Sequence, residues 1–272
     1  MLRTPVVAGQ FYPATALGLK KQLSGLCPAC GKKEDARGLI MPHAGYVYSG
    51  KVAGAVISRI NLKNILIIIG PNHTGMGEIF SLDRDELWQT PLGKIKINSG
   101  LSDEIIKNSK YIKKDSAAHR AEHSIEVELP FAQYVSHDPD NISIVPIVIG
   151  GGNLEIYKNI GVEIAAAVKK LNLAREAQII ASSDMTHYEE SETARIKDKK
   201  VLDAVLKLDP DLVYNTVKRE DVSMCGYAPC VIMLEAMRRL GASKAKLVKY
   251  ENSGDTTGDY SSVVGYAGVL IN

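Results

Sequence analysis

Short aliphatic runs, each closed by a turn signal, dominate the pattern of hydrophobic positions. The most continuous one spans residues 65–69, where five aliphatic side chains, four of them β-branched, precede Gly70 and Pro71. A run without polar alternation is typical of a strand buried on both faces of a parallel sheet. Further strands are predicted for the apolar runs at 38–41, 142–149, 177–181, 245–250 and 263–270.

Between these runs the apolar positions follow a helical period. Residues 49–60 and 154–171 each carry an apolar stripe, and Ser49 is the expected N-cap of the first helix. Further helices are predicted near 16–23, after a cap at Ser102, over 122–135 with an interruption at Pro130, within 193–217, and up to 240.

The order of these elements predicts the fold class. Strand, helix and strand over residues 38–69 form a βαβ unit, which is nearly always right-handed with parallel strands. Residues 79–98 alternate and carry a turn signal at 91–93, which predicts a β-ribbon inserted after His73. We therefore expect one α/β domain over residues 1–272, a three-layer α/β/α sandwich around a mostly parallel, mixed sheet.

Composition narrows the function classes. The chain has 272 residues, 45% of them hydrophobic, and a net charge of +2 without a dominant Lys/Arg cluster, so a nucleic-acid partner is not expected. No apolar run approaches the roughly 18 residues of a membrane span, and the start lacks a secretory signal, so we expect a cytoplasmic protein. Cys27 and Cys30 form a single Cys-x-x-Cys, for which a thiol-bearing loop or local disulfide is favoured over structural zinc.

Histidines follow three of the predicted strands. His43, His73 and His187 each lie just beyond a strand's carboxyl end, and Asp184 stands three residues before the last of them. In open α/β sheets ligands bind at that edge. A lone histidine is more often structural, but three of six in equivalent positions favour a functional cleft.

Cys225 is a candidate third ligand beside two imidazoles. It precedes Gly226 and a predicted helix, and a thiol at a helix N-terminus has a lowered pKa that favours the metal-binding thiolate. Two imidazoles and one anionic ligand would leave coordination positions open. The alternative, a small buried hydrophobe, is equally compatible with the sequence.

A second histidine pattern points to different chemistry. His119, Glu122 and His123 match His-x-x-Glu-His, the inverted zinc-peptidase signature. The pattern is short, and acidic residues follow it, so the polar start of a solvated helix is a strong alternative.

Several segments together resemble one known family. PVVAGQFYPA, PHAGYVYSG, IIIGPNHTG, DELWQTPLGKIKIN, EHSIEVELPF, SSDMTHY and MCGYAP occur in this order across nearly the whole chain. This set resembles the Memo family, named for a mediator of ErbB-driven cell motility. The resemblance implies a fold similar to class III extradiol dioxygenases, which hold non-haem Fe(II) with two histidines and a carboxylate.

The resemblance also implies residue roles. It matches His43 and His73 to the two histidine ligands, Cys225 to the position of the carboxylate, and His187 to a catalytic acid/base histidine, which Asp184 would orient. It suggests His123 and Glu126 as cleft-lining residues. Thiolate is a softer ligand than carboxylate and favours copper or zinc more, but it still permits iron. With the iron site of the resembled dioxygenases, this leaves iron or copper as the expected metal ion and zinc as the alternative.

Three functions follow as hypotheses. The first is a metal-dependent, dioxygenase-like redox enzyme acting on a small molecule. The second is a non-catalytic module on a retired dioxygenase scaffold that binds a peptide or small ligand. The third is a zinc hydrolase using His119 and His123. Prokaryotic members of the resembled family suggest a radical-SAM pathway partner.

Overall fold

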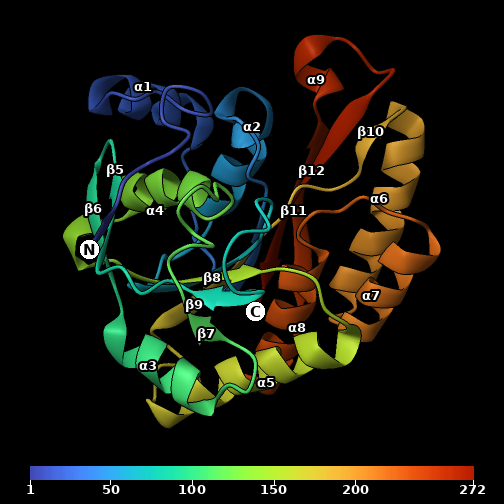
Figure 1. The fold of residues 1–272 in the computed structure, drawn as a ribbon. Coiled ribbons are helices and arrows are strands. Elements are labelled where there is room, and N and C mark those ends of the chain that lie inside the picture. The colour runs from blue at the N-terminus through green and yellow to red at the C-terminus, as the bar shows by residue number, and fades with distance from the viewer.

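A twelve-stranded mixed sheet lies between two helical layers in the computed structural model, which describes all 272 residues (Figure 1). The predicted three-layer α/β/α fold is therefore confirmed. Along the sheet the strand order is β1-β5-β6-β8-β3-β9-β2-β12-β10, with β4, β7 and β11 paired alongside. The strands are β1 (Leu2–Arg3), β2 (Gly38–Met41), β3 (Ile65–Pro71), β4 (Phe80–Leu82), β5 (Leu87–Thr90), β6 (Gly93–Ile97), β7 (Lys113–Lys114), β8 (Ser143–Ile149), β9 (Ala177–Ser182), β10 (His187–Glu189), β11 (Ala245–Asn252) and β12 (Val263–Ile271).

Strand β3 forms the centre of the sheet. It pairs in parallel with β8 on one side and β9 on the other, and β9 pairs in parallel with β2. Its odd-numbered residues from Ile65 to Ile69 join one hydrophobic cluster, whereas Leu66 and Ile68 join the other. The uninterrupted aliphatic run therefore reflects burial on both faces, because successive side chains point to opposite sides of a sheet.

Helices cover both faces. The larger cluster is built with α3, α5, α6, α7 and α8, and the smaller one with α1, α2 and α4. The helices are α1 (Ala16–Leu26), α2 (Tyr46–Ile57), α3 (Ser99–Asn108), α4 (Leu129–Val135), α5 (Leu154–Lys170), α6 (Ser191–Leu206), α7 (Pro210–Arg219), α8 (Tyr227–Arg239) and α9 (Gly254–Thr257), with 3-10 turns η1 (Glu126–Glu128) and η2 (Pro139–Asn141). None of these helices is both long and apolar enough to cross a bilayer.

Two predicted helix caps are wrong. Ser49 lies inside α2 and donates its hydroxyl to the Ala44 carbonyl, so it caps nothing. The cap of α3 is Asn98 rather than Ser102, because the Asn98 side chain accepts from the Leu101 amide. The predicted interruption at Pro130 is confirmed: the segment is divided into η1 and α4, and Pro130 stands in the first turn of α4, where a missing N–H costs nothing.

The predicted ribbon after His73 is present as the antiparallel hairpin β5–β6. It extends the central sheet, because β6 pairs in parallel with β8. Three short strands were not predicted: β1, β7 and β10, of which β10 pairs with the start of β12 at a sheet edge. Cys27 and Cys30 are free and partly buried, so the local disulfide is not formed.

Candidate metal centre

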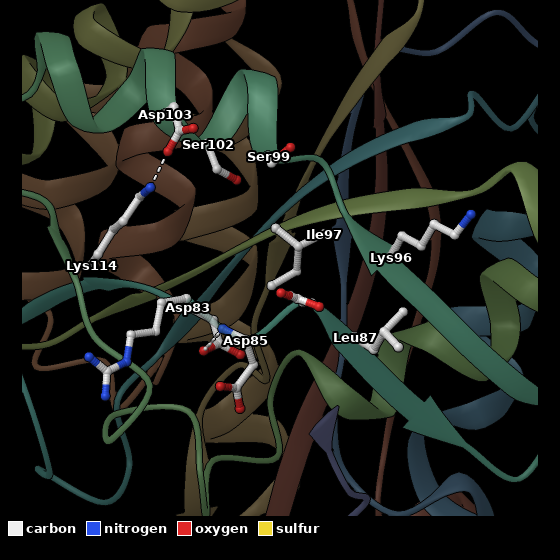
Figure 2. Close-up of a pocket in the computed structure, with 11 residues that line it drawn as sticks. Asp83, Asp85, Leu87, Lys96, Ile97, Ser99, Ser102, Asp103 and Lys114 are labelled. Carbon is white, nitrogen blue, oxygen red and sulfur yellow. Dashed lines mark hydrogen bonds and ion pairs between the residues drawn. The ribbon is translucent and has the colours of Figure 1, made fainter. Parts of the chain in front are cut away.

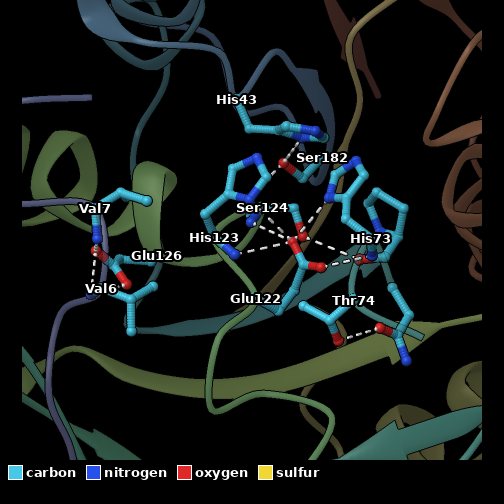
Figure 3. A network of polar contacts seen from close by, with 12 residues as sticks. Val6, Val7, His43, His73, Thr74, Glu122, His123, Ser124, Glu126 and Ser182 are labelled. Atoms are coloured by element: carbon cyan, nitrogen blue, oxygen red, sulfur yellow. Dashed lines mark hydrogen bonds and ion pairs between the residues drawn. The ribbon is translucent and has the colours of Figure 1, made fainter. Parts of the chain in front are cut away.

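Three imidazoles meet at the carboxyl edge of the sheet. His43 follows β2, His73 follows β3, and His123 precedes η1 (Figure 3). Each offers a ring nitrogen, and these nitrogens lie within 4.8 Å of one another. The ring centroids of His73 and His123 stack at 4.8 Å, and His43 meets both rings edge-on at 5.3 and 5.6 Å. This cluster could bind a metal ion, because imidazole is a common ligand of transition metals.

Glu122 holds His73 in place. Its Oε1 lies 2.9 Å from His73 Nδ1 and accepts the amides of His123 and Ser124, while Oε2 accepts the His73 amide (Figure 3). Burial alone would raise the pKa of Glu122, but the hydrogen bond and charge of His73, together with the Ser124 amide, lower it to about 2. The anionic carboxylate accepts from Nδ1–H and, despite burial, raises the pKa of His73, so a metal ion would take the place of a proton at Nε2. A carboxylate on Nδ1 is a common arrangement behind metal-binding histidines.

His43 is held from a different side. Its Nδ1 lies 2.8 Å from the Ser182 hydroxyl at the end of β9, and its amide donates to Asp184 Oδ1 at 2.9 Å. The residue is 1% exposed, and burial, together with the neighbouring imidazoles, lowers its pKa well below the usual value. His43 is therefore neutral, which is the protonation state in which an imidazole nitrogen can bind a metal.

Cys225 approaches His43 from the N-terminus of α8, but the group of ligand atoms within 4.8 Å of one another is completed by His123 and not by this thiol. Its Sγ lies 3.4 Å from His43 Nε2 and accepts the Asp184 amide at 3.3 Å. Two ligands of one tetrahedral ion, a nitrogen and a thiolate sulfur at typical bond lengths, stand about 3.5 Å apart. Gly226 permits this approach, since a Cβ there would lie 2.4 Å from the Ser182 carbonyl oxygen.

The predicted activation of this thiol by the helix N-terminus is wrong. Burial and the neighbouring Asp184 carboxyl raise the pKa of Cys225 well above its usual value. These two effects outweigh the helix dipole. A bound cation would supply the charge needed to hold the thiolate, because metal binding releases the proton of a ligating thiol.

His187 and Asp184 both lie near the cluster, but they are not bonded to each other. His187 is partly exposed; its Nδ1 lies 3.0 Å from the Ser223 carbonyl oxygen, and its amide donates to Ser223 Oγ at 2.7 Å. Asp184 instead accepts the amide of His43, and burial raises its pKa to about 6. Ser223, which the sequence did not suggest, therefore orients the His187 ring.

Comparison with known proteins identifies the family. The model of the Memo-like protein family matches residues 3–270. The chain belongs to the Memo-like family. A MEMO1 family protein of Methanosarcina acetivorans is 42% identical over 271 residues, with 99% of each chain covered. MEMO1 family proteins of Aquifex aeolicus and Nitrosopumilus maritimus are 39% and 38% identical, over 99% of this chain and 98% and 99% of theirs.

In this Memo-like protein only one of the two residues predicted to line the cleft, His123, lies in the imidazole cluster, whereas Glu126 does not. His123 joins the imidazole cluster and packs against the Phe11 ring at 5.0 Å. Glu126 is fully buried beside the N-terminal segment, where it accepts from Arg3 and from the Tyr12 hydroxyl at 2.6 Å. Its carboxylate is thus occupied by the N-terminal segment rather than offered to a ligand.

The residues behind the imidazoles were missed by sequence reasoning. Glu122, Ser182 and Ser223 hold the rings, yet only Glu122 had drawn attention, as part of a different motif. The available signal for Ser182 was its place at the end of β9, the edge at which the histidines gather.

The two histidines of the zinc-hydrolase hypothesis do not share a ligand cluster. His119 is fully buried, with Nε2 3.1 Å from Ser81 Oγ and its ring 6.0 Å from that of Trp88. His123 clusters with His43 and His73 instead. Of the two histidines in this short motif, His119 is therefore structural and His123 belongs to the imidazole cluster.

A hollow of about 560 Å³ lies between the β5–β6 hairpin and the start of α3 (Figure 2). Its lining is charged and includes the ion pair of Lys114 with Asp103. No residue of the imidazole cluster lines it. The volume of a hollow therefore does not by itself identify the candidate metal centre.

Proposed function

We propose that this Memo-like protein is a metal-dependent redox enzyme that acts on a small organic molecule. The observation that carries the proposal is the arrangement of His43 and His73. Separate buried partners hold Nδ1 of each ring, and the two ring centroids lie 5.3 Å apart. The Cys225 thiol stands 3.4 Å from His43 Nε2, and His123 completes the group of three imidazoles whose nitrogens lie within 4.8 Å of one another. Imidazole and thiolate are both ligands of transition metals, which supports a site at this point.

In this proposal His43, His73 and Cys225 hold the metal, and His123 stands within reach as a further ligand or a contact for substrate. Iron or copper is favoured and zinc is possible, since imidazole and thiolate suit all three. When bound, a redox-active ion would supply Lewis acidity and one-electron chemistry at its open positions.

His187 is the proposed acid/base residue. Donation of Nδ1–H to the Ser223 carbonyl leaves Nε2 with a lone pair, which can take a proton from a substrate hydroxyl. The charge of the imidazolium and that of the Asp184 carboxylate stabilise each other, although no hydrogen bond joins the two side chains. Asp184 therefore does not set the tautomer of His187.

The substrate would enter over an aromatic hollow of about 290 Å³ lined by Tyr48, Tyr188 and Tyr266. This hollow adjoins His187, because its residue Val264 pairs with His187 across β12 and β10. Tyr188 is 79% exposed and has a φ of 60°. A bulky residue in the left-handed region is strained, and such strain is concentrated at functional sites.

Metal analysis tests the proposal. Protein purified without chelator is compared with the His43→Ala/His73→Ala variant and with a His137→Ala control, which removes an exposed imidazole outside the cluster. We expect near one metal ion per chain in the wild type and the control, and loss of metal in the double variant. Equal metal in all three proteins would remove the proposed centre.

A binding module without chemistry is the second candidate. It is favoured by the exposed rings of Tyr48 and Tyr188 beside the cleft, which offer stacking surfaces for a peptide or small ligand. Turnover of a catechol or another small molecule that is lost in His187→Ala, with metal content unchanged, would exclude it.

A further inference from the structure

A chain of buried polar groups continues behind His43, beyond the residues assigned a role above. The Ser182 hydroxyl lies 2.8 Å from His43 Nδ1 (Figure 3). It also lies 2.7 Å from the Ser124 carbonyl oxygen and 3.0 Å from Glu128 Oε1. Ser182 and Ser124 are fully buried, and Glu128 is 1% exposed. Because these atoms are buried, each short contact must pair one donor with one acceptor.

The number of hydrogens available around the Ser182 hydroxyl decides which of its neighbours donates and which accepts. A serine hydroxyl has one hydrogen to donate and two lone pairs to accept with, and the Ser124 carbonyl can only accept. When Ser182 donates to Ser124, both other neighbours must donate to Ser182. His43 then carries its proton on Nδ1, and Glu128 carries a proton on Oε1.

The ionised form of Glu128 does not fit these contacts. A carboxylate only accepts, so Glu128 and the Ser124 carbonyl would compete for the single hydrogen of Ser182. One of the two short contacts would then join two acceptors. Moreover, Glu128 Oε2 is buried without any partner, which an anion tolerates far less than a neutral acid.

The electrostatic surroundings agree with this assignment. Burial raises the pKa of Glu128 well above its usual value, although a hydrogen bond from Ser182 to the carboxylate would lower it, and the neighbouring Asp184 carboxyl raises it further. The net direction disfavours the carboxylate, as the hydrogen-bond count does.

We propose that Glu128 is a neutral carboxylic acid that donates to Ser182 and, through Ser182, holds His43 as the Nδ1–H tautomer with Nε2 facing Cys225. Glu128 and Ser182 are positioning residues in this inference. The two imidazoles are thus oriented by carboxyl groups in opposite protonation states, since the Glu122 carboxylate accepts from His73 directly. A neutral partner on one ring and an anion on the other would make the two nitrogens unequal as ligands.

Infrared difference spectra test the protonation of Glu128 without any metal. We compare Glu128→Gln with Glu235→Gln, which removes an equally buried carboxyl that is bonded to the Arg239 guanidinium at 2.7 Å. At neutral pH the carbonyl stretch of a protonated acid should disappear in Glu128→Gln and persist in Glu235→Gln. Persistence of that band in Glu128→Gln would overturn the proposal.

Nitrogen NMR of the histidine rings tests the tautomer. The wild type should show His43 protonated on Nδ1, with its resonance identified by its absence in His43→Ala. Glu128→Gln should preserve this state, because an amide N–H can replace the carboxylic O–H as donor to Ser182. Ser182→Ala and Glu128→Leu should lose it; retention of the Nδ1–H tautomer in both would contradict the inference.

The consequence for metal binding rests on the proposed function and is measured separately. Zinc affinity should fall roughly 10- to 100-fold in Ser182→Ala and Glu128→Leu and stay within a few-fold of wild type in Glu128→Gln. If the protein bound no metal, the infrared and NMR results would still stand, so failure of the proposed function is distinguishable. Equal affinities in all variants, with metal bound, would show that this chain does not position His43.

Discussion

The buried ion pair between Arg3 and Glu126 ties the N-terminal segment to the residues around His123. Their side chains are 3% and 0% exposed, and the guanidinium lies over the Trp88 ring at 4.2 Å. Glu126 also accepts the amides of Val6 and Val7. We predict that Glu126→Leu strongly destabilises the fold, because it leaves a buried guanidinium without its counter-charge.

The magnitude follows from burial. Removing one partner of a buried pair costs about 3–5 kcal/mol, whereas an exposed pair contributes below about 1 kcal/mol. For a chain of this size such a loss lowers the melting temperature by roughly 10 °C. Arg3→Met/Glu126→Leu removes both charges. We therefore expect the double variant to lose less unfolding free energy than the sum of the losses measured for the two single variants.

Thermal unfolding of the four proteins in this double-mutant cycle measures the coupling. The matched control is the exposed helical pair of Lys199 and Asp203, whose alanine variants should each lie near wild type. Proteolysis should also release the first residues of Glu126→Leu faster than those of the wild type. Additive losses in the cycle, or a Glu126→Leu variant as stable as the control variants, would refute this reasoning.

Three further predictions concern stability. The pKa of Glu122 is about 2 in the fold against 4.5 unperturbed, so its carboxylate contributes about 3 kcal/mol to the free energy of unfolding above pH 4.5. This contribution is lost as the pH falls towards 2. Urea unfolding of Glu122→Gln should lack this pH dependence, and parallel stability curves for the variant and the wild type would contradict the prediction. Gly54→Ala should destabilise the fold by about 1–3 kcal/mol, because the added Cβ would lie 2.1 Å from the Leu26 carbonyl oxygen. In the control Gly25→Ala the added Cβ meets no atom within 4 Å, so the fold should gain up to about 1 kcal/mol of stability. Similar denaturation midpoints for the two variants would refute the clash. Tyr188→Gly should be more stable than Tyr188→Ala by about 1 kcal/mol, given the φ of 60°, and equal stabilities would exclude backbone strain.

The strands around β3 were predictable because burial on both faces leaves an uninterrupted aliphatic run. The strand ends then located His43 and His73 at one edge, since parallel strands share their direction. Helix starts were less predictable: Ser49 and Ser102 look like caps, but the chain enters each helix earlier. Local propensity cannot detect a turn of helix added by tertiary packing.

Long-range polar partners were not predictable from the sequence. The role of Glu126 depends on Arg3, 123 positions away, and no local pattern reports that pairing. The pKa of Cys225 was predicted in the wrong direction because the helix dipole is visible in sequence, whereas burial and the Asp184 carboxyl are visible only in three dimensions. Resemblance to the Memo family supplied the association of Cys225 with the two histidines, which spacing alone left open.

The separation of 182 positions between His43 and Cys225 has a consequence for biosynthesis. During synthesis His43 leaves the ribosome long before Cys225, and the Cys225 sulfur reaches His43 only once α8 has docked on the sheet. A nascent or truncated chain therefore offers histidines without their thiol partner. A cation held jointly by His43 and Cys225 would therefore require that α8 has docked, so occupancy by such an ion would report folding of the carboxyl-terminal part of the chain.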